Sequence, residues 1–391
     1  MGRSGCAYAR CLTLLVSTSL LLLTFSGHTS ERDLQAVERQ VVRDVCDRDL
    51  VLLGELPGHG EAVGFALKAR IVQRLVERCG FDAVLFEAGD YDFIGFEQAV
   101  ARGDAKAARL DNAIGGFWSN VELAGFRSWL FDQAVRRRLV VGGIDDQPGA
   151  TSRHASAVMP ALVAAQLPAT DAATCQQAVA RNLDWTYDKT HRFDAPERER
   201  LQVCARQALA RYADNDASSD RLMVESLFHY FSRQNRSPEG RERDRSMHRI
   251  LDWYRERLPK GSKVVVWTAT SHAAREQGAL PWKPLGALLA GAGETDMATI
   301  GFTALSGESG RRGSKRARLP ELPDDALEAR ALTSGAQARY LNNQALRAHD
   351  GRTSRLFGKA QVDRWSRHFD GVVVVREERA PTFPDATEPP K

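Results

Sequence analysis

The sequence has no marked excess of either charge, few cysteines and no internal repeat. Its 54 basic and 50 acidic residues give a formal net charge of only +4 over 391 residues. This balance does not call for nucleic acid as a partner. A local basic run at residues 311–318 lies within a Gly- and Arg-rich stretch, residues 305–322. We expect that stretch to be a mobile, solvated loop.

A long apolar run is found at the N-terminus. Arg3 and Arg10 precede the apolar residues 11–25, and small and polar residues follow at 26–30. This is the layout of a secretory signal, and the run is too short to span a bilayer comfortably. We therefore expect a signal peptide over residues 1–29, a secreted or periplasmic protein, and no stable membrane span after signal removal. An uncleaved anchor is the alternative.

Four cysteines remain after the expected signal peptide, and they allow three pairings. Cys46 stands just before the first predicted strand and Cys79 just before the second, at the same end of strands that we expect to be neighbours. A Cys46–Cys79 disulfide is therefore sensible, and Cys175 and Cys204 would then link two helices. The alternative is four buried free thiols; none of the four has the spacing of a zinc site.

The stretch Val51–Tyr91 organises the predicted fold. Residues 51–53 are apolar and closed by Gly54, residues 62–78 carry apolar side chains at helical spacing, and residues 83–86 form a second apolar run. Such a strand–helix–strand unit has parallel strands that end on the same side of the sheet. Glu55, His59 and Glu87 then gather at one sheet edge, where open α/β sheets place their ligands.

The remaining apolar runs extend this pattern to a whole domain. Further strands are predicted at residues 139–144, 263–267, 298–302 and 372–375, whereas residues 152–236 contain no convincing strand. The predicted fold class is α/β: a mostly parallel central sheet flanked by helices, with a large all-helical cap insertion. We expect core segments at 30–151 and 237–378, the cap at 152–236 and a disordered tail at 379–391.

Seven short motifs occur in an order that resembles the erythromycin esterase family, over about residues 45–310. They are GE…HG at 54–60, GFDAVLFEAGDYD at 80–92, FWSNVE at 117–122, GIDDQ at 143–147, RDRSM at 243–247, VVVWTATSH at 264–272 and IGFTALSG at 300–307. The resemblance implies a hydrolase that cleaves an ester or lactone with histidine-activated water and no covalent acyl-enzyme. Its expected partner is a small-molecule ester or lactone, with no cofactor.

The resemblance also assigns catalytic roles. His59 would be the general base, Glu87 would hold or polarise it, and Glu55 would line the same pocket. Arg243 would stabilise the developing oxyanion, and His272 would belong to the same site. A histidine near neutral pKa can accept a proton from water, and an arginine offers fixed donors to a tetrahedral oxyanion.

Four further residues are expected to bind substrate. Asp145 and Gln147 follow the third predicted strand at the same sheet edge, and Trp118 lies in the FWSNVE motif, where packing is its alternative role. Lys68 stands where the characterised macrolide esterases have an arginine on the first helix.

The chain departs from the family pattern in two further places. An extra residue separates Glu55 from His59, which we expect to be absorbed by a bulge at Gly58, and Ala269 replaces a family histidine. Two alternatives therefore stay open. One is a metal-dependent hydrolase in which two histidines and two glutamates hold a divalent ion. The other is a non-catalytic ligand-binding protein with a degenerate esterase site. The oligomeric state is not indicated.

Overall fold

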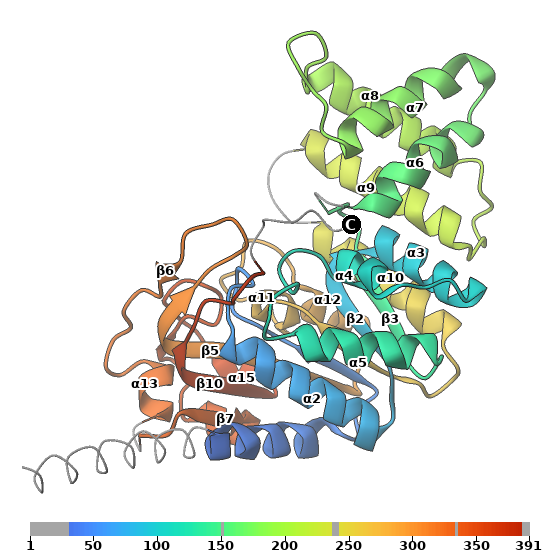
Figure 1. Cartoon of the computed structure of the whole chain (residues 1–391). Coiled ribbons are helices and arrows are strands. Elements are labelled where there is room, and N and C mark those ends of the chain that lie inside the picture. Colours follow the sequence, from blue (N-terminus) through green and yellow to red (C-terminus); the bar gives the residue numbers. More distant parts are fainter. Residues whose placement is uncertain (1–30, 150–151, 237–241, 333–334, 385–391) are drawn as a thin grey trace, which may run out of the picture.

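The computed structural model describes residues 31–149, 152–236, 242–332 and 335–384, so the predicted signal peptide lies outside the described residues. Its centre is an eight-stranded sheet in which the main strands run in the order β3-β2-β4-β1-β5-β10-β7, with β6 paired to β5. All neighbouring pairs along this order are parallel except β10 with β7. The predicted mostly parallel α/β sheet is therefore confirmed (Figure 1).

The strands are short, β-branched and deeply buried, as expected for a sheet covered on both faces. Their bounds are β1 Leu50–Leu53, β2 Phe81–Gly89, β3 Val140–Asp145, β4 Lys263–Trp267, β5 Met297–Ser309, β6 Ala317–Arg318, β7 Ala338–Asn342 and β10 Gly371–Glu378. A separate two-stranded sheet pairs β8 Thr353–Ser354 with β9 Gln361–Val362.

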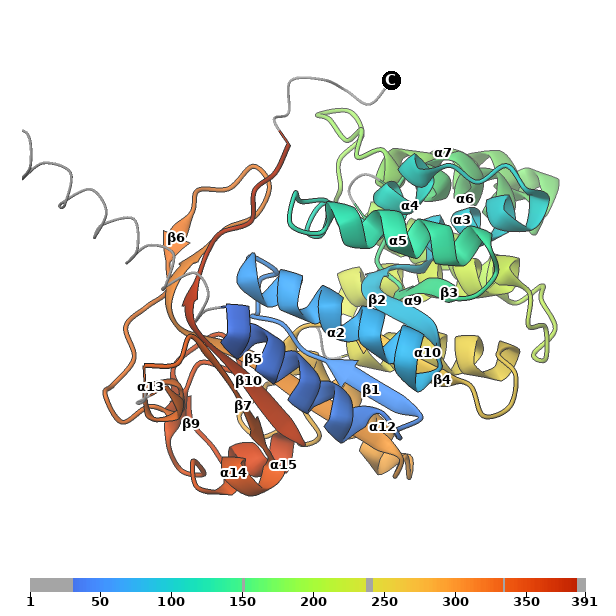
Figure 2. The same cartoon turned by 60° about the horizontal axis from the view of Figure 1, so that its bottom comes forward.

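Alternate side chains of the central strands fill two separate cores. Leu50 and Leu52 of β1 face one core, and Val51 and Leu53 face the other, because successive strand residues point to opposite faces. Figure 2 shows the helix of residues 31–45 and the helices α2 and α5 on one face of the sheet, with α12 on the other.

The helices of the core occupy both faces. Their bounds are α2 Val63–Cys79, α3 Asp90–Arg102, α4 Ala107–Ile114, α5 Ala124–Val135, α10 Arg243–Arg257, α11 Thr270–Ala273, α12 Leu285–Gly291, α13 Leu327–Ala331, α14 Asn343–Arg347 and α15 Trp365–His368. Helix α2 ends where predicted, because Gly80 takes the left-handed conformation of a C-cap, at φ 71°. No helix among the described residues is long and apolar enough to cross a membrane.

Between β3 and α10 the chain forms four helices that stand together above the sheet in Figure 1. They are α6 Arg153–Ala165, α7 Ala169–Leu183, α8 Ala195–Leu209 and α9 Ser219–Arg236. A disulfide between Cys175 and Cys204 joins α7 to α8. This lobe, the cap, contacts the core through α3 and α10.

The second disulfide is the predicted Cys46–Cys79 pair, with Cα atoms 5.2 Å apart. The two strands that follow these cysteines, β1 and β2, were expected to be neighbours, but they are parallel and not adjacent. Strand β4, about 200 residues later in the sequence, lies between them and pairs with both. The two cysteines still meet, since each stands just before a strand at the N-terminal edge of the sheet.

The loop expected at residues 305–322 is present only in its middle: residues 311–316 form an exposed loop, whereas residues 305–309 belong to β5 and residues 317–318 form β6. Strand β5 continues to Ser309 and pairs with β6, and Gly310 donates its N–H to the carbonyl of Gly60 (3.1 Å). Contrary to the expected disorder, residues 379–384 are also bonded to the core: Thr382 accepts the N–H of Val121 (2.8 Å). Residues 385–391 lie outside the described residues.

Candidate active site

Four neighbouring strands end at one edge of the sheet and carry the candidate residues there. Glu55 follows β1, Glu87 lies within the end of β2, Asp145 closes β3, and His272 belongs to α11, directly after β4. Because these strands are parallel and adjacent, their C-terminal ends meet. The predicted gathering of Glu55, His59 and Glu87 is what the structure has, with β4 adding His272 between them.

Glu55 is fully buried and accepts hydrogen bonds from four side chains. Lys68 Nζ donates to it at 3.0 Å, Trp267 Nε1 at 2.5 Å and Trp118 Nε1 at 3.2 Å, and the fourth donor is His59 Nδ1. An uncompensated buried carboxylate would be very costly, so this set of donors is what makes it tolerable. Glu55 therefore lies behind the histidine and orients it, and does not line the pocket as expected.

His59 is held in an unusual backbone conformation. Its φ is 55° and that of Gly58 is 109°, so the turn carries two successive residues with positive φ. A non-glycine residue in this region is uncommon, and strained positions of this kind concentrate at functional sites. The ring of Phe117 stacks on the imidazole with centroids 4.9 Å apart. The extra residue between Glu55 and His59 is thus accommodated at the glycine, as the sequence suggested.

Glu87 faces three cationic or titratable nitrogens. Its Oε1 lies 3.1 Å from Arg243 Nη2, 3.4 Å from His272 Nε2 and 3.7 Å from His59 Nε2. Its Oε2 accepts from Thr268 Oγ1 (2.8 Å) and from the backbone of Ala269 (2.7 Å). Burial raises the pKa of Glu87. The neighbouring His272, Arg243 and His59 lower it by more than burial raises it, so the pKa of Glu87 is well below its usual value. Glu87 is the negative centre of the site.

Arg243 and His272 are fixed by two aspartates. Arg243 donates to Asp145 (2.6 Å), and His272 Nδ1 to Asp244 (2.7 Å). Burial lowers the pKa of His272, but Glu87 and Asp244 outweigh it, and the net shift is upward. Burial likewise opposes the charge of Arg243, yet Asp145 and Glu87 raise its pKa overall. The site therefore places the Arg243 guanidinium and a histidine of raised pKa beside Glu87.

Of the four residues expected to bind substrate, Trp118, Asp145 and Gln147 line the cavity at this sheet edge, and Lys68 does not. Lys68 is fully buried and donates to Glu55 and to the carbonyl of Thr268 (3.2 Å), so it supports the site from behind and does not reach the pocket. Trp118 is also buried, with its N–H on Glu55. Gln147 is exposed at the pocket rim, and Asp145 holds Arg243.

Sequence reasoning missed three contributors. Asp244 is fully buried against His272 and also accepts the N–H of Leu285 (2.7 Å). Phe117 lies on the base, and Arg312 comes from the presumed loop to line the cavity. The adjacency of Asp244 to Arg243 in RDRSM was the available signal for the first; no pattern indicated the others.

The cavity at this edge has a volume of about 370 Å³. His59, Glu87 and Arg243 form its polar side, and Phe117 and Ile114 contribute apolar surface. Its shape and chemistry suit a small organic substrate presented to the base.

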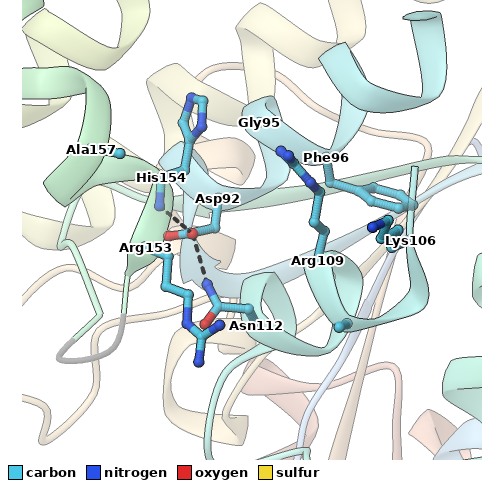
Figure 3. Close-up of a pocket in the computed structure, with 10 residues that line it drawn as sticks. Asp92, Gly95, Phe96, Lys106, Arg109, Asn112, Arg153, His154 and Ala157 are labelled. Carbon is cyan, nitrogen blue, oxygen red and sulfur yellow. Dashed lines mark hydrogen bonds between the residues drawn. The ribbon is translucent and has the colours of Figure 1, made fainter. Parts of the chain in front are cut away.

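A second cavity of about 340 Å³ adjoins the first and shares Asp92 and Asn112 with it. Figure 3 shows Asp92 accepting from Asn112 Nδ2 (2.8 Å) and from the backbone N–H of His154 (2.9 Å). Ser152 Oγ also donates to Asp92. Asp92 thus ties α3 and α4 of the core to α6 of the cap.

The arrangement of these side chains also bears on the alternative of a metal-dependent hydrolase. Among the described residues, no group of three or more His, Cys, Asp or Glu side chains is arranged to hold a metal ion. One ring nitrogen of each candidate histidine is already hydrogen-bonded: His59 Nδ1 to Glu55, and His272 Nδ1 to Asp244.

A buried carboxylate–histidine pair thus lies beside a second carboxylate, an arginine and a second histidine at the C-terminal edge of the parallel strands. The sequence model of the erythromycin esterase family matches residues 76–378. The chain therefore belongs to the erythromycin esterase family, as the motifs predicted. A search of curated protein sequences found no match.

Solved structures with the same fold include three proteins of low sequence identity. A Bacillus cereus protein is 13% identical with a TM-score of 0.67, and a succinoglycan biosynthesis protein is 14% identical with 0.66; each alignment covers 91% of this chain and 99% of the other. A histidine-to-asparagine mutant of the erythromycin esterase EreC, in its open conformation, is 17% identical, with a TM-score of 0.59 and coverage of 87% and 93%. At these identities the likeness shows the fold.

Proposed function

We propose that this protein hydrolyses a carboxylic ester or lactone with water activated by His59, without a covalent acyl-enzyme. The observation that carries the proposal is the hydrogen bond of His59 Nδ1 to the buried Glu55. In a neutral imidazole whose Nδ1 carries the proton, Nε2 is the basic nitrogen. That nitrogen lies on the cavity side, 3.7 Å from Glu87 Oε1.

The proposed reaction balances within this set of groups. A water held between His59 and Glu87 attacks the carbonyl carbon while His59 Nε2 takes its proton, giving a tetrahedral oxyanion. When the carbon–oxygen bond to the leaving group breaks, the imidazolium returns the proton to the departing alkoxide. The ionised Glu87 stabilises the imidazolium in between, because opposite charges at this distance interact strongly in a partly buried site.

Arg243 is the proposed partner of the oxyanion. It stays charged at all relevant pH values, and Asp145 holds its guanidinium by two nitrogens, Nε at 3.1 Å and Nη2 at 2.6 Å. A donor fixed before the reaction costs no reorganisation when charge develops on the substrate. His272, whose pKa is raised, lies beside the same carboxylate, with Nε2 3.4 Å from Glu87 Oε1.

The proposed setting is secretion or export to the periplasm. Two disulfides link the described cysteines, which is compatible with an oxidising compartment. The substrate is proposed at the level of an ester or lactone, the class to which the family name points.

The test is hydrolysis of p-nitrophenyl esters and of a macrolide panel by the mature protein, beside His59→Ala. His191→Ala is the matched control, since that histidine is exposed on the cap and bonded only within its own turn. We expect turnover that is lost in His59→Ala, kept in the control and unaffected by a chelator. Loss to chelator with recovery on added zinc or manganese would establish the metal-dependent alternative. No turnover of any ester would establish a binding protein.

A further inference from the structure

Trp185 is a large apolar side chain that the fold leaves in solvent. Its side chain is 61% exposed, although tryptophan is usually largely buried. It stands just after Asp184, the C-cap of α7, and its φ is 50°. A bulky residue at positive φ is strained, and a position like this one at a helix end is normally taken by glycine or asparagine. Neither folding nor solubility accounts for a tryptophan here.

The indole is nevertheless held in one place. Tyr187 packs edge-on against it with ring centroids 5.3 Å apart, and Phe193 lies 5.1 Å away. These two rings also contact each other, at 5.0 Å. Tyr187 and Phe193 support the Trp185 ring from one side, so that it offers a fixed surface at little further entropic cost on binding.

Trp185 lines a large cavity between the cap and the core, with a volume of about 820 Å³. The cavity also contains Gln147, Ser156 and Asp184. Gln147 and Asp184 are exposed, and the side chains of all three make no hydrogen bond to other described residues. An aromatic surface thus stands beside an amide, a hydroxyl and a carboxylate that are available to a ligand.

This cavity adjoins the candidate active site. Gln147, Gly149 and Ser152 line both the cap cavity and the cavity that contains His59. A substrate longer than the cavity at His59 can therefore extend across these shared residues toward Trp185.

We propose that the cap cavity is a saccharide subsite, and that the substrate is an acylated sugar whose ester lies at His59 while a sugar ring stacks on Trp185. A pyranose has a face of C–H groups, which the negative face of an indole attracts, and a rim of hydroxyls. The rim hydroxyls would meet the free Gln147, Ser156 and Asp184. A purely apolar ligand would leave these polar groups desolvated and unpaired, which is costly. The inference rests on the proposed ester hydrolysis for its reaction and on the cap for its specificity.

The test compares kcat and KM for p-nitrophenyl acetate with those for a panel of mono-O-acetylated methyl glucosides, mannosides and galactosides. The variants are Trp185→Ala, Trp185→Phe and, as control, Val362→Ala, which removes an equally exposed apolar side chain (62%) from a distant two-stranded sheet. We expect Trp185→Ala to lower kcat/KM for at least one acetyl sugar, relative to p-nitrophenyl acetate, by about tenfold, a typical stacking loss. The loss falls on KM, Trp185→Phe recovers most of it, and the control shows none. Melting temperatures report on folding.

A second measurement separates this proposal from the proposed reaction. The His59→Ala protein, with and without Trp185→Ala, is titrated with the same acetyl sugars by calorimetry. Binding that depends on Trp185 supports the subsite even if no ester is ever hydrolysed. Turnover of p-nitrophenyl acetate without any Trp185-dependent preference or binding across the panel would overturn the subsite and leave the esterase standing. Equal losses on both ester types would likewise overturn it, since they indicate a structural role.

Discussion

Glu55 and His59 form the contact on which the proposed chemistry depends, and it has the form of a carboxylate orienting an imidazole. Lys68 and the indoles of Trp118 and Trp267 donate to the Glu55 oxygens and hold the carboxylate against Nδ1 of His59. The carboxylate therefore selects the neutral tautomer in which Nδ1 carries the proton and Nε2, on the cavity side, does not.

Glu55→Gln tests this orientation. An amide can turn its NH₂ toward Nδ1, which then becomes the acceptor and leaves Nε2 protonated and useless as a base. We expect kcat for a p-nitrophenyl ester to fall by about 10³–10⁴, the scale known for wrong-tautomer variants. Glu97→Gln, an exposed residue paired with Arg257 (2.8 Å), is the control. A Glu55→Gln enzyme that is folded by circular dichroism and fully active would disprove the assignment.

His272 should titrate above an ordinary histidine. Burial lowers its pKa, but the carboxylates of Glu87 and Asp244 raise it overall. A raised folded pKa means that the stability His272 contributes is fully present below about pH 6.5, its unfolded pKa, and is lost as pH rises through the folded value. NMR titration of the histidines should show this upward shift of the His272 pKa. Asp244→Asn should reduce the shift, and the free energy of unfolding should then depend less on pH above pH 6.5. An unchanged titration in Asp244→Asn would contradict the pairing.

At the scale of single residues the sequence located the site but not all the roles. Glu55, His59, Glu87 and Asp145 follow strand ends, and the parallel arrangement alone brings such positions together. Which carboxylate binds which ring depends on contacts between distant segments. Asp244, 28 positions before His272, is one such contact, and no local spacing reports it.

At the scale of elements the strand–helix–strand pattern predicted the direction of the strands but not their order. Apolar runs in the sequence identify buried strands, whereas the insertion of β4 between β1 and β2 is decided by packing. The segment from β5 to β6 shows the converse limit. Its basic composition suggested a solvated loop, and residues 311–316 are an exposed loop, but composition did not indicate that Arg311 donates to Gly58 and lies over Phe117, 5.3 Å from its centroid.

Asp92 joins three helices and is the clearest element-scale target (Figure 3). It accepts from Asn112 of α4 and from Ser152 and His154 at the start of α6. Asp92→Ala leaves these partly buried donors without an acceptor, and we expect unfolding free energy to drop by about 1–3 kcal/mol. Urea denaturation measures the change. Asp132→Ala, on the exposed side of α5, is the control and should shift the midpoint of urea denaturation little. Equal effects in the two variants would argue against a stabilising role for the Asp92 hydrogen bonds to α4 and α6.

The whole molecule consists of a sheet core and a cap, each with one disulfide. The proposed catalytic groups come from the core: His59, Glu87 and Arg243 all lie at the sheet edge or on α10. The cap contributes most of the wall of the adjoining cavity that contains Trp185. Our proposals thus assign the reaction to one part and substrate selection to the other, so the two parts should respond separately to a change confined to the cap.

Removing the Cys175–Cys204 disulfide is such a change. The bond closes a segment of 29 residues between α7 and α8, for which the chain-entropy account gives about 3.6 kcal/mol. In the Cys175→Ala/Cys204→Ala double variant, hydrogen exchange should therefore speed up in α6–α9 while the central strands keep their protection. The Cys46→Ala/Cys79→Ala variant is the counterpart, because its bond lies at the N-terminal edge of the sheet and its loss should instead expose α2 and β1. Uniform loss of protection across cap and sheet in the first variant would show that the two parts unfold as one unit, and the separate roles assigned to them would have no thermodynamic basis.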